Sequence, residues 1–171
     1  PNMDTTPGVD LILPDISWLK ERRNQIEAIF ITHGHEDHVG AVGHLWGDLG
    51  APIYARAFTA HLARHKMSDH GHSEQSVRTV SKWPETTSVG PFTVGFLPIS
   101  HSIPESSALV IDTPVGRIVH TGDFKLDTNP VVGETFDEAL WAEVAKDGVH
   151  ALVCDSTNVF SDHAGRSEFT L

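Results

Sequence analysis

The stretch IFITHGHEDHV at residues 29–39 decides how the rest of this sequence is interpreted. It joins an apolar run, Ile29–Ile31, to a segment in which three imidazoles and two carboxylates lie within six residues. The apolar run is typical of a buried strand, and Val39–Val42 is typical of the start of a helix. The polar cluster is therefore expected on a strand-to-helix loop at the edge of a sheet, where side chains can converge.

These residue types are metal ligands in this arrangement. Imidazole and carboxylate are ligands that zinc prefers, and no thiol lies nearby. His33 and His35 are separated by one residue and can share one metal, whereas Asp37 and His38 follow the turn and can face a second. Burying such groups without a metal would be costly in desolvation and repulsion. The alternative is a histidine-rich surface loop, but the His-x-His-x-Asp-His spacing directly after a strand favours a metal site.

Bulk composition indicates an ordinary globular protein. A chain of 171 residues with 39% hydrophobic content supports one domain with a core, or a piece of a larger one. No apolar run approaches the ~20 residues that span a bilayer, and the N-terminus lacks the features of a signal peptide. Cys154 is the single cysteine. An internal disulfide is thus excluded, and a cytoplasmic location without membrane association is expected.

The charge balance is strongly acidic, with 12 basic and 23 acidic residues and a net charge of −11. Taken alone, this balance argues against nucleic-acid binding. Two bound zinc ions would add about four positive charges at one place and could attract a phosphate there. The chain also has twelve histidines, of which five are expected to face solvent: His44, His61, His65, His70 and His72.

Strand and helix patterns alternate along the chain and predict a layered α/β or α+β domain. The expected helices cover 16–25, 39–45 (ended by Gly47 and Gly50), 58–66 and 136–146. The expected strands cover 27–32, 52–55 and 92–99, a hairpin of 108–112 with 117–121, and a last buried strand over 151–154. Residues 1–14 form a Pro/Gly-containing opening without a strand, and the tail 161–171 is polar. Both ends suggest a fragment of a longer chain.

Two further polar groups follow predicted strands. His101 comes after the apolar run 96–99, and Asp123 comes after 118–121. His101 can donate to the first zinc, and the two oxygens of Asp123 can bridge both ions. Each alone would be an ordinary loop or turn residue, but together with the first cluster they predict a dinuclear centre. Asp155 either caps a turn or hydrogen-bonds a ligand histidine, and His120 is expected to be packed within its strand.

At this point the chain resembles the metallo-β-lactamase fold superfamily through His33–His38, and its RNase J group of β-CASP ribonucleases through four further motifs. These motifs are GVDLILPD at 8–15, HSIPES at 101–106, HTGDFKLD at 120–127 and DSTN at 155–158. They lie in the expected order over nearly the whole chain.

The resemblance implies an α+β fold, an αββα sandwich with metals at one edge of its two sheets. It implies that one zinc is held by His33, His35 and His101, that Asp37 and His38 hold the second, and that Asp123 bridges them. Asp155, Ser156 and Thr157 would support the site. Residues 1–171 would then be a partial metallo-β-lactamase domain, incomplete at both ends. The leading strands, the β-CASP domain with its further metal-binding histidine, and the C-terminal parts would be absent.

The implied activity is hydrolysis of RNA phosphodiester bonds by a hydroxide shared between two zinc ions, with Mn²⁺ as an alternative metal. Asp37 and Asp123 are the expected catalytic carboxylates. The resemblance suggests 5′-to-3′ exonuclease action on 5′-monophosphorylated RNA together with endonuclease action, in a full-length homo-oligomer. Two alternatives stay open. One is a hydrolase of a small ester or phosphodiester on the same fold, and the other is an inactive metal-binding fragment.

Overall fold

The computed structural model describes residues 6–162 and residue 167, and it contains two β-sheets. The first sheet is parallel, with the order β1 (Ile29–Phe30), β2 (Ile53–Ala55) and β3 (Val77–Thr79). Its strands are joined through α2 (Glu36–Val39) and α3 (Val42–Leu49), and then through α4 (Ala57–Asp69) and the 3-10 turn Glu74–Ser76. Parallel neighbours need such crossovers, because a short turn cannot return the chain to the starting end of the sheet.

The second sheet has the order β4-β5-β6-β7-β8. The four strands β4 (Thr86–Val89), β5 (Phe92–Pro98), β6 (Ser107–Thr113) and β7 (Gly116–His120) form an antiparallel meander. The helix α5 (Glu138–Ala145) then leads to β8 (Ala151–Val153), which pairs with β7 in parallel. Asp137 caps α5, since its carboxylate accepts the backbone N–H of Leu140.

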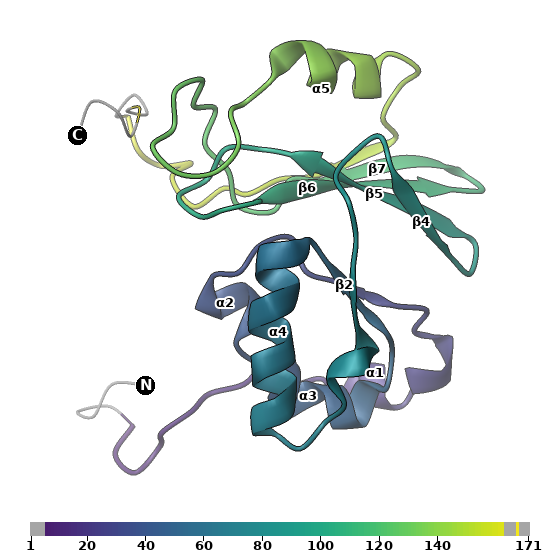
Figure 1. The fold of residues 1–171 in the computed structure, drawn as a ribbon, viewed down its shortest axis with the longest axis vertical. Coiled ribbons are helices and arrows are strands. Elements are labelled where there is room, and N and C mark those ends of the chain that lie inside the picture. Colours follow the sequence, from purple (N-terminus) through teal and green to yellow (C-terminus); the bar gives the residue numbers. More distant parts are fainter. Residues whose placement is uncertain (1–5, 163–166, 168–171) are drawn as a thin grey trace.

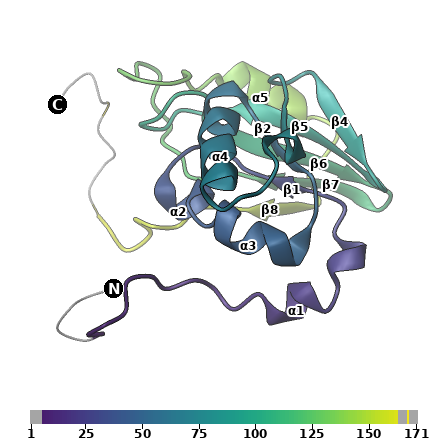
Figure 2. The same ribbon diagram turned by 60° about the horizontal axis from the view of Figure 1, so that its bottom comes forward.

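The two sheets pack face to face, with helices on the outer faces (Figures 1 and 2). Between the sheets, Tyr54 of β2 joins Phe96 and Leu109 of the second sheet, and Phe30 stacks on Tyr54 with ring centroids 5.2 Å apart. On the outer face of the second sheet, Val144 of α5 packs against the buried residues of β5 and β6. These four layers confirm the predicted αββα sandwich.

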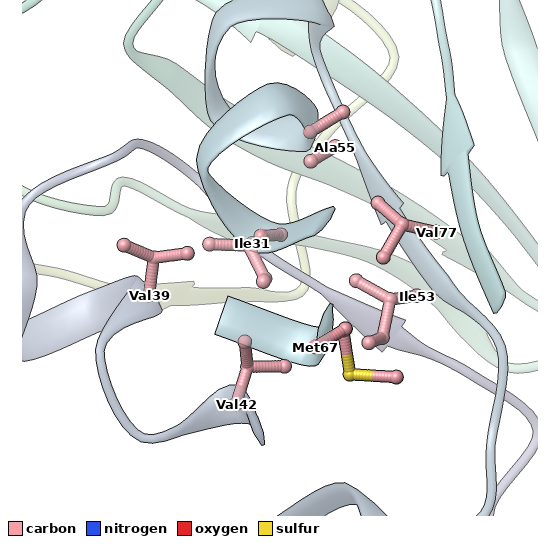
Figure 3. Packing of buried hydrophobic residues seen from close by; sticks show 9 residues of the cluster. Ile31, Val39, Val42, Ile53, Ala55, Met67 and Val77 are labelled. Atoms are coloured by element: carbon pink, nitrogen blue, oxygen red, sulfur yellow. The ribbon is translucent and has the colours of Figure 1, made fainter. Parts of the chain in front are cut away.

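The helices α2, α3 and α4 cover the outer face of the first sheet (Figure 3). Because side chains alternate along a strand, Ile53 and Ala55 point to the helices while Tyr54 between them points to the other sheet. Val39, Val42 and Met67 close this core from the helical side. The local period of two therefore places an apolar side chain on each face of β2, as expected for a strand between two layers.

Most predicted elements exist, with shifted bounds. The helix expected over 16–25 is a short α1 (Ser17–Lys20) followed by the 3-10 turn Arg23–Gln25. The helix expected over 39–45 is divided into α2 and α3, and Gly47 lies inside α3 rather than ending it. The helix ends at Gly50, whose φ of 69° is the left-handed conformation that glycine adopts without strain. The strands β3 and β4 were not predicted, because they are short and partly exposed.

The expectation of a buried last strand was wrong. All three residues of β8 are exposed, with Leu152 at 60% and Val153 at 49%. Within the described residues, β8 is an edge strand that pairs with β7 alone, so apolar composition did not imply burial there. The expectations for residues 1–5, 163–166 and 168–171 lie outside the described residues. Along the part of the chain that the structure describes, no helix is both long and apolar enough to cross a membrane.

Truncation of one methylene in the helix-covered core should have a modest and measurable cost. Ile53 is 0% exposed and contacts the cluster shown in Figure 3. The substitution Ile53→Val is expected to lower the free energy of unfolding by about 1 kcal/mol, because it removes buried apolar surface and leaves a small cavity. Urea denaturation measures this loss. Val115→Ala is the control, since Val115 is 88% exposed and its truncation should change stability by less than half as much.

Candidate metal centre

The candidate ligands are brought together by the ends of strands from both sheets. His33 follows β1, His101 follows β5 and Asp123 follows β7. The strands β5 and β7 run in the same direction, because each is antiparallel to β6 between them. Their carboxyl ends therefore lie at the same edge of the second sheet, next to the loop that leads from β1 into α2. His101 and Asp123 are both more than 60 residues away from His33 in the sequence.

Three imidazoles form the first group, which consists of His33, His35 and His101. One nitrogen of each ring lies within 4.8 Å of the others. His101 Nε2 and His35 Nδ1 are 3.0 Å apart. The ring of His33 meets those of His35 and His101 nearly at right angles, at centroid distances of 4.9 Å. These are the three residues expected to hold one metal.

The second group contains His33, His38 and Asp123. Asp123 Oδ2 is 3.3 Å from His38 Nε2 and 4.0 Å from the Nε2 atoms of both His33 and His101. One carboxylate oxygen thus lies between the ligands of the two groups. This position suits the predicted bridging role of Asp123, which stays a prediction.

Electrostatics favour the neutral imidazole at two of the candidate ligands, His33 and His101. Burial, together with the neighbouring histidines His38, His101 and His35, lowers the pKa of His33 to about 3. Burial and the neighbouring His35 also lower the pKa of His101, although the carboxylate of Asp123 acts in the opposite direction. A neutral imidazole has a free lone pair, which is the form that binds a metal.

Hydrogen bonds hold the ligand loops against one another. Thr32 Oγ1 is 3.0 Å from His33 Nδ1, which leaves Nε2 of His33 directed to the centre. The backbone N–H of Ser107 donates to Thr32 O at 3.1 Å. Gly122 has a φ of 60°, and a Cβ there would lie 3.0 Å from Thr32 Cβ. A glycine at 122 therefore lets the Asp123 loop approach the His33 loop closely.

A second set of bonds joins the loops of His101 and Asp123. The backbone N–H of Lys125 donates to Ser100 O at 2.8 Å, and the N–H of Asp127 donates to Ser100 Oγ at 2.9 Å. Ser100 directly precedes His101, and it is 1% exposed. The position of His101 relative to Asp123 is thus fixed by buried hydrogen bonds rather than by the two side chains themselves.

Two predicted residues lie apart from the groups. The carboxylate of Asp37 is 77% exposed and lies 3.6 Å from His38 Nε2, but it is in neither group. Asp155 Oδ1 accepts hydrogen bonds from the backbone N–H and the hydroxyl of Thr157, at 2.9 Å and 2.6 Å. These bonds lower the pKa of Asp155. The turn-capping alternative for Asp155 is therefore what the structure shows. The roles of Asp37, Asp155, Ser156 and Thr157 in the site stay predictions.

Arg56 was not singled out from the sequence. It follows β2 at the same edge and is 7% exposed. Its guanidinium lies 2.7 Å from Glu134 Oε1 and donates to Ser107 Oγ at 3.4 Å, and it lies 3.9 Å from Glu105 Oε1. Glu105 and Ser107 lie where the loop that contains His101 runs into β6, whereas Glu134 belongs to the segment after Asp123. A cation directly after the strand Ile53–Ala55 was the signal that could have identified this residue.

The donor set fits a divalent transition metal. His33 Nε2 and His101 Nδ1 are buried and have no hydrogen-bond partner within the described part of the chain. Leaving a buried polar atom unpaired is costly, and a metal ligated by His33 Nε2 would remove that cost. Imidazoles and a carboxylate match the ligand preferences of zinc, and carboxylates also suit manganese.

Acidification is expected to destabilise the metal-free protein through His33. The folded protein keeps His33 neutral down to about pH 3, whereas an unfolded chain takes up the proton near its ordinary pKa of 6.5. The unfolded state therefore binds more protons between these values, and stability falls as the pH falls through this window. Between pH 7 and pH 5, His33 should lower the free energy of unfolding by about 2 kcal/mol.

Urea denaturation in the presence of a chelator tests this pH dependence. His33→Gln should have a flatter profile of stability against pH than the native protein. His44→Gln is the matched control, because His44 is exposed on α3 and its replacement should leave the slope unchanged. Equal slopes for the native protein and His33→Gln would contradict the prediction.

Comparisons with known proteins agree with this geometry. A model of the "Metallo-beta-lactamase superfamily" matches residues 4–156. Ribonuclease J of Sinorhizobium meliloti is 46% identical over 162 residues, which are 95% of this chain and 29% of the relative. Ribonuclease J of Corynebacterium glutamicum is 38% identical, covering 95% of this chain and 22% of the relative. Ribonuclease J2 of Bacillus subtilis is 37% identical, covering 88% and 27%. The chain thus spans less than a third of the length of these relatives.

One solved structure, a protein of unknown function from Enterococcus faecalis V583, shares the fold with a TM-score of 0.56 at 18% identity. The match covers 82% of this chain and 33% of that one. The family match extends over most of the sandwich and includes every candidate ligand described above. The four-layer architecture, the strand-end histidines and the matched family agree, and the chain belongs to the metallo-β-lactamase superfamily.

Proposed function

We propose that this chain is the catalytic part of a metal-dependent ribonuclease that hydrolyses RNA phosphodiester bonds. The observation that carries the proposal is the convergence of His33, His35, His101, His38 and Asp123 at one sheet edge. The substrate class comes from the relatives named Ribonuclease J, of which the Sinorhizobium meliloti protein matches 95% of this chain at 46% identity.

In this proposal His33, His35 and His101 would hold one zinc ion, Asp37 and His38 would hold a second, and the carboxylate of Asp123 would serve both. When bound, the two ions activate a water molecule and stabilise negative charge on the phosphoryl oxygens. Manganese is the alternative metal. The candidate ligands are held in position because they follow buried strands and because Thr32 and Ser100 make hydrogen bonds beside them. Such preorganisation lets the charges act without rearrangement during the reaction.

The acidic surface also bears on the substrate. With a net charge of −11, the chain as a whole repels a polyanion. Local positive charge would have to come from the metal centre and from basic segments of a longer protein. We therefore propose that the RNA is held chiefly outside this chain, and that this chain performs the hydrolysis. The proposed products are those of 5′-to-3′ exonuclease action on 5′-monophosphorylated RNA, together with endonuclease cleavage.

The test is an RNA hydrolysis assay with the full-length protein. A 5′-monophosphorylated oligoribonucleotide labelled at its 3′ end is compared with its 5′-triphosphorylated form and with a panel of small esters and phosphodiesters. Hydrolysis of RNA should stop with a chelator and return with Zn²⁺ or Mn²⁺. The 5′-monophosphorylated RNA should be shortened fastest. Hydrolysis of the small esters, with no cleavage of the RNA, would instead favour a different hydrolase on the same fold. Failure on all substrates with metal bound would favour a metal-binding module.

A further inference from the structure

Two histidines on α4 form a pair that belongs to neither group of the metal centre. His61 and His65 are one helical turn apart, and both are exposed. Their Nε2 atoms are 3.2 Å apart, and the two rings meet at 83° with centroids 4.5 Å apart. Residues at positions i and i+4 lie on the same face of a helix, so this proximity follows from the helix itself.

The spacing of the two nitrogens suits a shared metal ion. Zinc–nitrogen bonds of about 2.0–2.1 Å at tetrahedral angles separate two ligand nitrogens by about 3.4 Å. The observed 3.2 Å is close to this value, and small side-chain rotations can adjust it. Two histidines at i and i+4 on one helix face are also how helical zinc motifs hold their ion. Within the described residues, no third histidine, cysteine or carboxylate completes a group with them, so water would fill the other positions.

The neighbouring cations are engaged elsewhere. Arg64 donates to Val77 O and to Thr79 Oγ1, at 3.0 Å and 2.8 Å. Lys66 donates to both carboxylate oxygens of Glu36, at 2.6 Å and 2.9 Å. Both side chains are thus held by contacts to other elements, and the positive charge of Lys66 is partly offset by the carboxylate of Glu36. The overall charge of −11 further favours a cation at the surface.

The other histidine pair in this region has a different geometry. His44 of α3 and His70, directly after α4, have ring centroids 3.9 Å apart and an interplanar angle of 54°. Their rings pack on each other, as in an aromatic contact. A metal binds in the plane of an imidazole, along its nitrogen lone pair. Within the described residues, no hydrogen bond joins ring nitrogens of His44 and His70, unlike those of His61 and His65, so this pair supplies a matched control.

We propose that His61 and His65 form a surface site for one borderline divalent transition-metal ion, such as Ni²⁺, Cu²⁺ or Zn²⁺. The site binds through two imidazole nitrogens and is independent of the centre at the sheet edge. It is expected to be weaker than that centre, since the protein supplies two ligands rather than three or more. An ion held there links two successive turns of α4, whose Leu62 side chain packs next to Gly34 between His33 and His35.

Titration calorimetry with Ni²⁺ tests the proposal. The full-length protein is first saturated with Zn²⁺ and desalted, so that the stronger centre is filled. Native protein should then bind one further Ni²⁺. His61→Ala and His65→Ala should each weaken this event roughly tenfold or more, because a chelate loses its second ligand at high effective concentration. Both residues are exposed and alanine is the best helix former, so both variants should fold, as circular dichroism checks.

His70→Ala is the control, since it removes an exposed imidazole from the same region but keeps the proposed pair. Its Ni²⁺ affinity should equal that of the native protein. Unchanged Ni²⁺ binding in the double variant His61→Ala/His65→Ala would overturn the proposal. A loss of Ni²⁺ affinity in His70→Ala as large as that in the His61 and His65 variants would overturn it as well. Because zinc content of the main centre is measured in every variant, failure of this site is distinguishable from failure of the proposed ribonuclease centre.

Discussion

Replacing Asp123 with asparagine is expected to lower the proposed ribonuclease activity of the full-length protein by about 10³-fold or more. Asp123 Oδ2 lies between His38, His33 and His101 at 3.3 Å, 4.0 Å and 4.0 Å. Asparagine keeps the shape of the side chain but removes the negative charge that would offset the two proposed metal ions. A neutral amide is also a poorer ligand than a carboxylate for a metal of this class.

The measurement is kcat/KM on 5′-monophosphorylated RNA, combined with metal content by elemental analysis. Asp123→Asn should hold fewer metal ions per chain than the native protein as well as losing activity. Asp147→Asn is the matched control, because Asp147 is an exposed aspartate after α5 and its replacement should change neither quantity. Native activity in Asp123→Asn would contradict both the bridging role and the proposed centre.

The candidate metal centre was predictable from sequence to the extent that its candidate ligands are close in sequence or follow apolar runs. His33, His35, Asp37 and His38 lie within six residues, so their proximity needs no knowledge of the fold. His101 and Asp123 were placed by their positions after strands, and the structure brings both to His33. The side chain of Asp37 is the exception: it is largely exposed, because the first turn of a short helix directs successive residues to different sides.

The fold was less predictable where tertiary packing, rather than the local sequence pattern, decides whether a segment is buried or forms a regular element. Apolar residues in β8 resembled a buried strand, but the strand lies at a sheet edge and is exposed. Conversely, β4 alternates exposed and half-buried threonine, serine and valine, and its pairing with β5 rather than its composition makes it a strand. Gly47 continues α3 although glycine is a poor helix former. Tertiary contacts outweigh local preference at each of these positions.

Arg56 shows the same limit at the site itself, because its partners are 49 to 78 residues away in the sequence. Replacing it with methionine is expected to lower the free energy of unfolding by about 3 kcal/mol, since the change leaves Glu134 without its main partner. Partial burial acts to raise the pKa of Glu134, but the hydrogen bond and charge of Arg56, with help from Lys82, hold that pKa below its usual range. Without Arg56, only Lys82 would oppose the effect of burial on the pKa of Glu134.

Urea denaturation of Arg56→Met measures this loss, and Arg22→Met is the control. Arg22 pairs with the exposed Glu21 at 3.2 Å, and such surface pairs contribute about 0–1 kcal/mol. The double variant Arg56→Met/Glu134→Gln should recover part of the stability, because it removes the unpaired carboxylate as well. A loss in Arg56→Met no larger than in Arg22→Met would show that the ion pair is not required for folding.

The same substitution should also weaken metal binding by roughly tenfold or more, an effect of the size seen when residues that orient ligands are lost. Arg56 contacts Ser107 and approaches Glu105 beside the His101 loop, and it binds Glu134 in the segment after Asp123. Its removal frees the two loops to move relative to each other. Zinc affinity is measured without urea, where the variant is fully folded, so that weaker binding is not a result of unfolding. Loss of stability with unchanged zinc affinity would mean that the bonds of Ser100 alone hold His101 and Asp123 in place.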